Sequence, residues 1–196
     1  MGTFTEMPSA IGTSEIVRDA YDLLTSKHAG QRQKVNGHPY VEHPILVATD
    51  VSRAGFDPEM VAAALLHDIV EDSDVSIEDV QERFGRRVSI LVEVMTDDAE
   101  VEPYKRRKAV HREQISRADT DAAAIYAADK LSNLRGTRAA FAELGEEAAS
   151  RLNQPLNDKL AVWEADAEML ARFGDAIPYR EDLAEEVAAA RAELSP

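Results

Sequence analysis

The chain has 196 residues, of which 22 are Lys or Arg and 37 are Asp or Glu, so its formal net charge is −15. This acidity argues against a long nucleic-acid partner, because such partners are held mainly by basic side chains that neutralise phosphates. The absence of cysteine excludes disulfides, thiolate metal sites and a cysteine nucleophile. Any bound metal must therefore be held by histidines and carboxylates, which suits Mn, Fe, Co, Ni or Zn.

The chain also lacks the features of a membrane or secreted protein. No apolar run approaches the roughly 18 residues of a membrane span, and residues 1–12 lack the basic-then-apolar order of a signal peptide. We therefore expect a cytoplasmic protein with no membrane partner.

Helical periodicity dominates the chain and predicts an all-α fold. The expected helices cover residues 14–28, 44–55, 58–72, 76–85, 86–96, 104–117, 120 onward, 155–173 and 180–194. Ser14 is expected to cap the first of them, and Asp57 with Pro58 has the sequence of an N-cap followed by a first-turn proline. Ser76 and Asp79 have the spacing of a capping box. We expect a single domain over residues 14–196, preceded by an extension over 1–13.

The segment from Ala62 to Asp72 is the most informative part of the chain, because an apolar run leads directly into four ionisable side chains. Residues four apart share a helix face, so His67 should lie over Glu71, and Asp68 over Asp72. Burying such carboxylates without a partner is costly, and a divalent cation would relieve that cost. The alternative is a solvated helix end with a chance His-Asp pair, which the apolar lead-in and the two further carboxylates disfavour.

Two more segments carry candidate ligands. His43 precedes Pro44 after an irregular stretch, and Asp129 and Asn133 are spaced four apart within an apolar helix. By itself, His43 is explained as a residue at a helix start, and Asp129 as a structural carboxylate with satisfied hydrogen bonds. Their occurrence together with His67 and Asp68 favours a joint site.

In combination, these segments resemble the hydrolase domain of the RelA/SpoT family, within the HD-domain metal phosphohydrolases. The resemblance is strongest to the stand-alone small alarmone hydrolases, which include the metazoan SpoT homologue, and it covers roughly residues 16–138. The matching segments are Gly37-His38-Pro39-Tyr40-Val41-Glu42-His43-Pro44, Ala63-Ala64-Leu65-Leu66-His67-Asp68-Ile69-Val70-Glu71-Asp72, Phe84-Gly85 with 92–98, and Ala128-Asp129-Lys130-Leu131-Ser132-Asn133-Leu134-Arg135.

The resemblance implies an HD-domain helical bundle and a Mn²⁺-dependent (p)ppGpp 3′-pyrophosphohydrolase, which yields GDP or GTP and pyrophosphate. Carried over residue by residue, the metal ligands are His43, His67, Asp68 and Asp129. Metal coordination lowers the pKa of water and produces a nucleophile near neutral pH. Glu71 and Asp72 align with the carboxylates that orient this water and handle its proton.

Substrate binding is expected to use basic and amide side chains from three segments. The candidates are Arg32, Lys34, Lys108, Lys130 and Asn133. Lys108 belongs to a basic cluster over 105–108, whose members point in several directions if that segment is helical. Family members usually have an adjacent Arg-Lys pair near residue 32, with the arginine stacked on guanine. Here Gln33 separates the two basic residues, which leaves both a guanine-selective and a more relaxed pocket open.

Two other functions stay open at this point. One is an HD phosphohydrolase for another nucleotide, such as NADPH, motivated by Gln33. The other is a catalytically weak alarmone-binding or toxin-neutralising protein, against which the retained Glu71 and Asp72 argue. The chain has no room for the synthetase and regulatory domains of the long RelA/SpoT proteins, so we expect it to act alone on a small nucleotide. A partner alarmone synthetase is a further expectation, and the oligomeric state is left open.

Overall fold

The computed structural model describes residues 7–98 and 100–194, and these residues form helices joined by loops. Their β pairing is limited to one isolated antiparallel bridge between Arg32 and Pro39, which confirms the predicted all-α class. In chain order the elements are η1 (Ser9–Ile11), α1 (Glu15–Lys27), α2 (Glu42–Arg53), α3 (Pro58–Leu66), α4 (Ile69–Asp72), α5 (Ile77–Phe84), α6 (Arg86–Met95), α7 (Tyr104–Arg117), α8 (Thr120–Leu144), α9 (Glu146–Arg151), α10 (Leu156–Leu170), η2 (Ala171–Ala176) and α11 (Arg180–Leu194).

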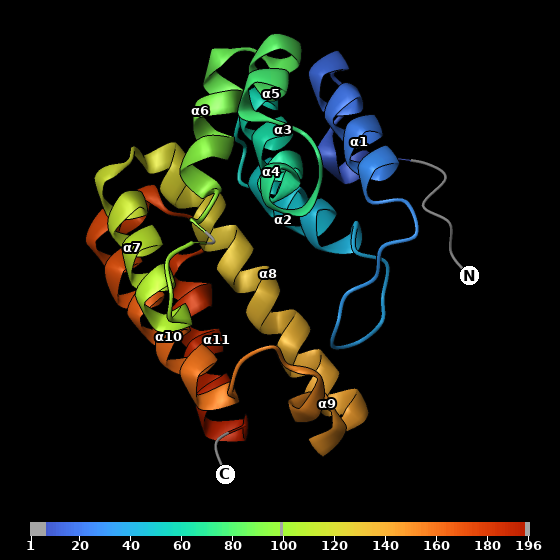
Figure 1. The fold of residues 1–196 in the computed structure, drawn as a ribbon. Helices are drawn as coiled ribbons and strands as arrows, with labels where there is room; N and C mark the ends of the chain where they lie inside the picture. Colours follow the sequence, from blue (N-terminus) through green and yellow to red (C-terminus); the bar gives the residue numbers. More distant parts are fainter. Residues whose placement is uncertain (1–6, 99, 195–196) are drawn as a thin grey trace.

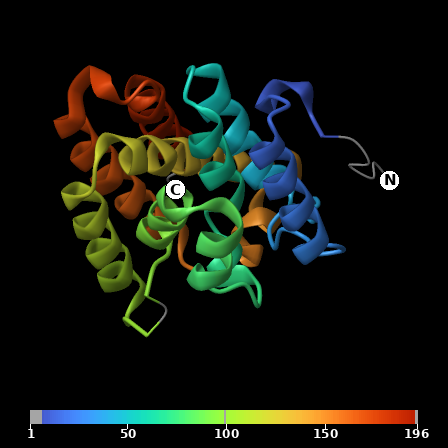
Figure 2. The same cartoon turned by 90° about the horizontal axis from the view of Figure 1, so that it is seen from above.

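The long helix α8 runs through the middle of the molecule (Figure 1). It packs against α2, α3 and α6 from the N-terminal half and against α7, α10 and α11 from the C-terminal half, and the second view shows the same arrangement from above (Figure 2). Every residue from 122 to 131 is buried, as expected for a helix that is covered on all sides. A polar side chain on this stretch therefore faces other helices and needs a partner there.

The N-terminal half is built around α3, whose residues 60–66 are all buried. Helices α1 and α2 pack on α3, and η1 packs on α2. Ile11 of η1 is buried in the core, although it belongs to the predicted N-terminal extension. The part of that extension over 1–6 lies outside the described residues, and the boundary near residue 14 stays a prediction.

Most predicted helix ends agree with the structure. The Asp57 carboxylate accepts the backbone N–H groups of Glu59 and Met60, and Ser76 and Asp79 form the predicted capping box. Ser14 occupies the N-cap position of α1, but its hydroxyl makes no capping hydrogen bond to the described residues. The short helix α9 was not predicted, and the predicted helix over 155–173 divides into α10 and η2.

The predicted continuous helix over 58–72 is wrong, because it breaks between α3 and α4. Asp68 leaves the helical region with φ −103° and ψ 2°. The Nδ1 atom of His67 lies 2.8 Å from the carbonyl oxygen of Ala64, which is the oxygen that the N–H of residue 68 would use in an uninterrupted helix. This side-chain bond competes with the helical ladder. His67 and Glu71 therefore do not share one face of a regular helix.

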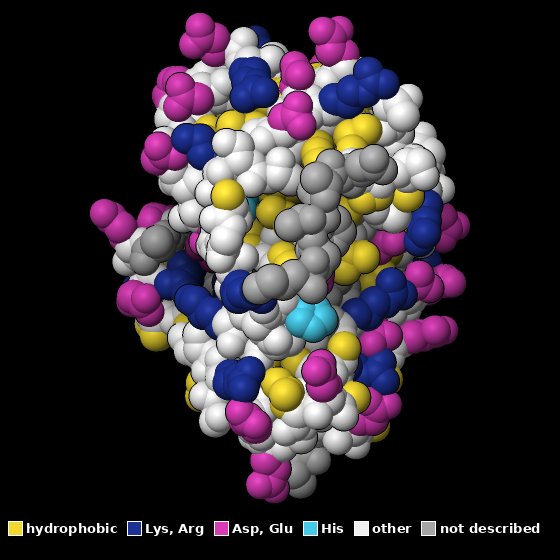
Figure 3. Space-filling view, turned by 90° about the vertical axis from the view of Figure 1, so that its right-hand side faces the viewer, with side chains coloured by type: hydrophobic (Ala, Val, Ile, Leu, Met, Phe, Trp, Pro, Cys, Tyr) yellow, Lys and Arg dark blue, Asp and Glu magenta, His cyan; other side chains and the backbone are white. Residues whose placement is uncertain are grey.

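The surface carries charges of both signs. On the face drawn in Figure 3, acidic and basic side chains are interspersed and form no continuous basic stripe. In the part of the chain that the structure describes, no helix has both the length and the apolar character needed to cross a bilayer.

Candidate active site

Three side chains from distant parts of the chain meet on one side of α8. His43 comes from the first turn of α2, His67 from the junction between α3 and α4, and Asp129 from the buried stretch of α8. Each offers one ligand atom, and these atoms all lie within 4.8 Å of one another. The Oδ1 atom of Asp129 lies 3.1 Å from Nε2 of His43 and 3.6 Å from Nε2 of His67. This spacing would allow one metal ion to be bound by all three side chains.

The two imidazole rings are oriented by their other nitrogen atoms. Nδ1 of His43 lies 3.1 Å from the Ser132 hydroxyl, and Nδ1 of His67 lies 2.8 Å from the Ala64 carbonyl oxygen. Both Nε2 atoms are buried, and neither makes a hydrogen bond to the described residues. An Nδ1–H donor to a carbonyl or hydroxyl fixes the tautomer and leaves Nε2 as a lone-pair donor, as in metal-binding histidines. The donor set therefore fits a divalent cation.

Asp68 lies beside this group, next to the two histidines, although it is not one of the three residues whose ligand atoms all lie within 4.8 Å of one another. Its Oδ2 atom lies 3.2 Å from Nε2 of His67 and 3.8 Å from Nε2 of His43. The same oxygen accepts a hydrogen bond of 3.0 Å from the hydroxyl of Tyr40, which also donates to Asp72. The structure thus brings three of the four predicted ligands into one group and places the fourth, Asp68, beside its two histidines. It also adds Tyr40, which sequence reasoning missed, as a hydrogen-bond donor to Asp68.

The electrostatics of this cluster favour a positive charge. Burial opposes protonation of His67, but the carboxylates of Asp68 and Asp129 outweigh it and raise the pKa of its imidazole well above the usual range. Burial also opposes ionisation of Asp129, yet Lys130 and the two histidines hold the pKa of its carboxyl well below the usual range. Two ionised carboxylates beside two imidazoles create the potential that a cation would neutralise.

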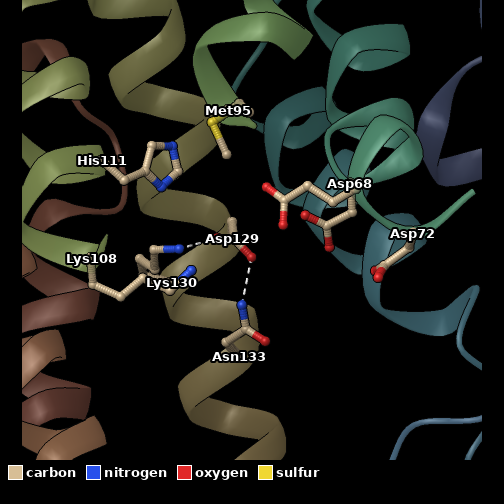
Figure 4. Close-up of a pocket in the computed structure, with 9 residues that line it drawn as sticks. Asp68, Asp72, Met95, Lys108, His111, Asp129, Lys130 and Asn133 are labelled. Atoms are coloured by element: carbon tan, nitrogen blue, oxygen red, sulfur yellow. Dashed lines mark hydrogen bonds and ion pairs between the residues drawn. The ribbon is translucent and has the colours of Figure 1, made fainter. Parts of the chain in front are cut away.

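A pocket of about 170 Å³ opens beside these ligands. Figure 4 shows its two unlike walls, with Asp68 and Asp72 on one side and Lys108 and Lys130 on the other. The described residues that line it are Asp68, Glu71, Asp72, Met95, Lys108, His111, Asp129, Lys130 and Asn133. Acidic groups thus face cationic groups across a space of small-molecule size.

A family model for the HD domain matches residues 20–163. The chain belongs to the HD-domain family. This confirms the resemblance that the His43, His67-Asp68 and Asp129 segments predicted.

Several relatives of this HD-domain chain are named guanosine-3′,5′-bis(diphosphate) 3′-pyrophosphohydrolase, and one is named GTP pyrophosphokinase. The pyrophosphohydrolase from Aquifex aeolicus is 33% identical over 162 residues, which are 80% of this chain but only 23% of the relative. The Homo sapiens protein MESH1 is 42% identical over 120 residues, covering 60% of this chain and 66% of the relative. The Drosophila melanogaster protein is 39% identical over 140 residues, covering 70% and 74%. The chain thus spans about a quarter of the first relative and just under two thirds of the second.

Solved structures show the same fold. A metazoan ortholog of SpoT, described as hydrolysing ppGpp and acting in starvation responses, superposes with a TM-score of 0.76 at 29% identity. That match covers 91% of this chain and 97% of the other. A Listeria monocytogenes EGD-e protein matches with a TM-score of 0.68 at 30% identity, covering 74% of this chain and 96% of the other.

The predicted catalytic carboxylates of the HD-domain site lie at the edge of the pocket. Glu71 accepts a hydrogen bond of 2.7 Å from the backbone N–H of Asp97. Its side chain reaches solvent, but the pocket walls remove part of its hydration, and this burial together with the Asp68 charge raises the pKa of its carboxyl to about 7. A carboxylate with this pKa can accept and release a proton near neutral pH.

A second pocket of about 260 Å³ adjoins the first, and Glu71, Lys108, Lys130 and Asn133 line both. Its other described lining residues are Asp97, Tyr104, Arg107, Asn153, Lys159, Val162, Trp163 and Asp166. Three predicted substrate residues, Lys108, Lys130 and Asn133, are therefore brought together here. Asn133 also donates to Oδ1 of Asp129 at 2.6 Å, which orients that carboxylate.

Helix α10 contributes pocket residues that sequence reasoning missed. Lys159 lies with its Nζ atom 5.2 Å from the centre of the Trp163 ring, one helical turn away. Burial, followed by the charges of Lys108 and Lys130, lowers the pKa of Lys159 to about 8. A Lys and a Trp four residues apart on a helix were the available sequence signal, but nothing in the sequence placed that helix beside Lys108.

Other predicted basic residues lie elsewhere. Arg32 donates to the Gly37 carbonyl at 2.7 Å within its own loop, and neither it nor Lys34 is among the described lining residues of these two pockets. In the cluster over 105–108, Lys105 pairs with Asp158 on the surface. Arg107 and Lys108 line the second pocket. The cluster thus points in several directions, as the helical periodicity predicted.

Proposed function

We propose that this HD-domain protein hydrolyses ppGpp and pppGpp at the ribose 3′ position, releasing pyrophosphate and leaving GDP or GTP, with Mn²⁺ as its metal. One observation carries the proposal: two buried imidazole Nε2 atoms without hydrogen-bond partners among the described residues sit with two carboxylates at a pocket whose opposite wall is cationic. Such a pocket suits a substrate with a reacting phosphate beside a metal and further negative charge beyond it. The names of the relatives support this substrate class.

The metal would be held by His43, His67, Asp68 and Asp129. Two imidazoles and two carboxylates form a mixed nitrogen and oxygen donor set, which suits Mn²⁺. When bound, a divalent cation supplies Lewis-acid polarisation of phosphate oxygens and lowers the pKa of a water molecule.

The chain's own residues supply proton transfer and charge. Glu71, with its pKa raised to about 7, is suited to take the proton that the attacking water loses. Lys108, Lys130 and Arg107 face the pockets and would bind the oxygens of the leaving pyrophosphate. Tyr40 and Asn133 hold the carboxylates of Asp68 and Asp129 in position.

The test is pyrophosphate release from ppGpp by the purified protein, after chelation and again after Mn²⁺ is restored. We expect turnover only with metal, with GDP as the second product, and none from His67→Ala. A panel that includes NADPH and other purine nucleotides runs alongside. A much better substrate in that panel would replace ppGpp, and binding of ppGpp without turnover would favour an alarmone-binding protein.

Several narrower statements stay predictions from the sequence. These are the domain boundary at residue 14, the cytoplasmic location, and a partner alarmone synthetase. The guanine contact assigned to Arg32 or Lys34 is another. Kinetics of purified Arg32→Ala and Lys34→Ala variants would show which substitution raises KM for ppGpp.

A further inference from the structure

Asp97 lines the second pocket together with Lys108 and Arg107. Among the described residues, it is the one acidic side chain that pairs with both of these cations. Its carboxylate pairs with the Lys108 ammonium and lies 3.5 Å from Nε of Arg107. The Asp97 side chain is only 6% exposed, although it belongs to the connection between α6 and α7. Its backbone N–H donates to Oε1 of Glu71 at 2.7 Å. One residue therefore contacts both the cationic wall and the proposed catalytic base.

The Asp97 carboxylate occupies a position that is suited to a phosphate oxygen. An ionised carboxylate and a phosphate offer the same kind of acceptor to Lys and Arg donors. Burial opposes ionisation of Asp97, but Lys108 and the neighbouring positive charges outweigh it and lower the pKa of its carboxyl. Asp97 is thus an anion, and a substrate phosphate that approaches Lys108 must share it or displace Asp97.

We propose that the Asp97 carboxylate occupies the place where Lys108 and Arg107 would bind a phosphate. It pairs with these two cations until an anionic group of the substrate replaces it. This inference rests on the proposed function, since it concerns the same pocket. Because the Asp97 backbone bonds Glu71, the exchange couples phosphate binding to the proposed base. Displacement of the carboxylate shifts the backbone N–H and releases Glu71 from this bond as the substrate arrives.

The test compares Asp97→Asn with Asp98→Asn. Both remove one negative charge from the same loop, but Asp98 is exposed, and among the described residues its carboxylate accepts a hydrogen bond only from the N–H of Glu100. We expect Asp97→Asn to lower KM for ppGpp and the dissociation constant of inorganic pyrophosphate about fivefold, as expected for losing one competing ion pair. Asp98→Asn should change both by less than twofold.

A double-mutant cycle identifies the partner. In a Lys108→Ala background, Asp97→Asn should tighten pyrophosphate binding much less than in the wild type, because only the longer pair of Asp97 with Arg107 is left to lose. In the wild type, pyrophosphate should shift the amide proton resonance of Asp97 upfield as its hydrogen bond to Glu71 breaks. Asp98→Asn should preserve that shift.

A higher or unchanged KM in Asp97→Asn, with pyrophosphate bound no more tightly, would overturn the proposal and leave Asp97 as a structural residue. Calorimetry with pyrophosphate on chelator-treated protein keeps this result separate from the proposed function. If the wild type does not hydrolyse ppGpp, the proposed function fails while the pyrophosphate comparison still decides the role of Asp97. If ppGpp is hydrolysed and the two Asn variants behave alike, only the Asp97 inference fails.

Discussion

Tyr40 carries no charge, yet its hydroxyl connects a proposed metal ligand to a proposed catalytic carboxylate. It donates to Oδ2 of Asp68 at 3.0 Å and also to Asp72. Burial, together with these two carboxylates, raises the pKa of the phenol, so that Tyr40 stays a donor. Its ring packs against His28, with the ring centres 4.5 Å apart.

We expect Tyr40→Phe to weaken Mn²⁺ binding by about tenfold, since the loss of a group that orients a ligand has effects of this order. The phenyl ring preserves the packing on His28, so the fold should be maintained. Titration calorimetry measures the affinity. Tyr179→Phe is the matched control, because its hydroxyl bonds the Asp50 carbonyl at the far end of α2. Equal Mn²⁺ affinities in both variants would contradict the orienting role of Tyr40.

Glu71 should control the acid side of the pH profile. Its pKa is raised to about 7 in the metal-free protein, and only the ionised form can accept a proton. The rate should therefore fall as pH drops through this value, and a bound cation moves the limb lower because a nearby positive charge favours the carboxylate. We expect kcat/KM to show an acid limb at or below about pH 7.

The Glu71→Gln variant should lose roughly 100-fold in kcat together with the acid limb, while it still binds metal. Glu82→Gln, an exposed change on α5, is the control and should keep the wild-type profile. An unchanged rate in Glu71→Gln would exclude Glu71 as the base.

At the scale of elements, α3 matters because it delivers His67 to the site. Its N-terminus is fixed by Asp57, whose carboxylate accepts two backbone N–H groups at 3.1 Å and pairs with Arg87 at 2.7 Å. We expect Asp57→Ala to lower the free energy of unfolding by about 1–2 kcal/mol.

Urea unfolding measures this loss. Ser14→Ala is the matched control, because Ser14 holds the equivalent position on α1 without a capping hydrogen bond among the described residues. It should change stability by less than about 0.5 kcal/mol. Similar losses in both variants would show that the cap geometry at Asp57 is not what stabilises α3.

The helices show which part of the structure is local and therefore predictable. The bounds of α7 and α11 follow from periodicity, and the cap at Asp57 follows from side-chain chemistry. The break at His67 does not, because it depends on a side-chain bond to the Ala64 carbonyl, which competes with the helical one. Long-range packing was equally hidden, since Lys159 and Trp163 lie at the second pocket only because α10 packs on α7 and α8.

The same distinction applies to the site. His67 and Asp68 are adjacent in sequence, so their joint presence could be predicted, whereas the approach of His43 to within 3.1 Å of Asp129 depends on the packing of α2 on α8. The family motifs supplied that information where the residue pattern alone did not. The contact of Asp97 with Glu71 had no sequence signal, because it uses a backbone N–H.

At the scale of the whole molecule, the proposed metal centre joins segments that are far apart in the chain. His43 belongs to α2, His67 and Asp68 to the junction of α3 and α4, and Asp129 to the central helix α8. A cation held by these residues would connect the N-terminal half to α8. Because the unfolded chain cannot present all four ligands together, such an ion binds the folded state preferentially and stabilises it.

We expect Mn²⁺ at about 100 times its dissociation constant to add roughly 2.7 kcal/mol to the free energy of unfolding. For a chain of this length, that corresponds to a rise in Tm of about 5–10 °C. Differential scanning calorimetry of chelator-treated protein, with and without added metal, measures the shift. His67→Ala should abolish it, because it removes a buried ligand. His38→Ala should keep it, since His38 is exposed and pairs only with Glu42 in the described ion pairs. A full shift in His67→Ala would place the stabilising ion elsewhere.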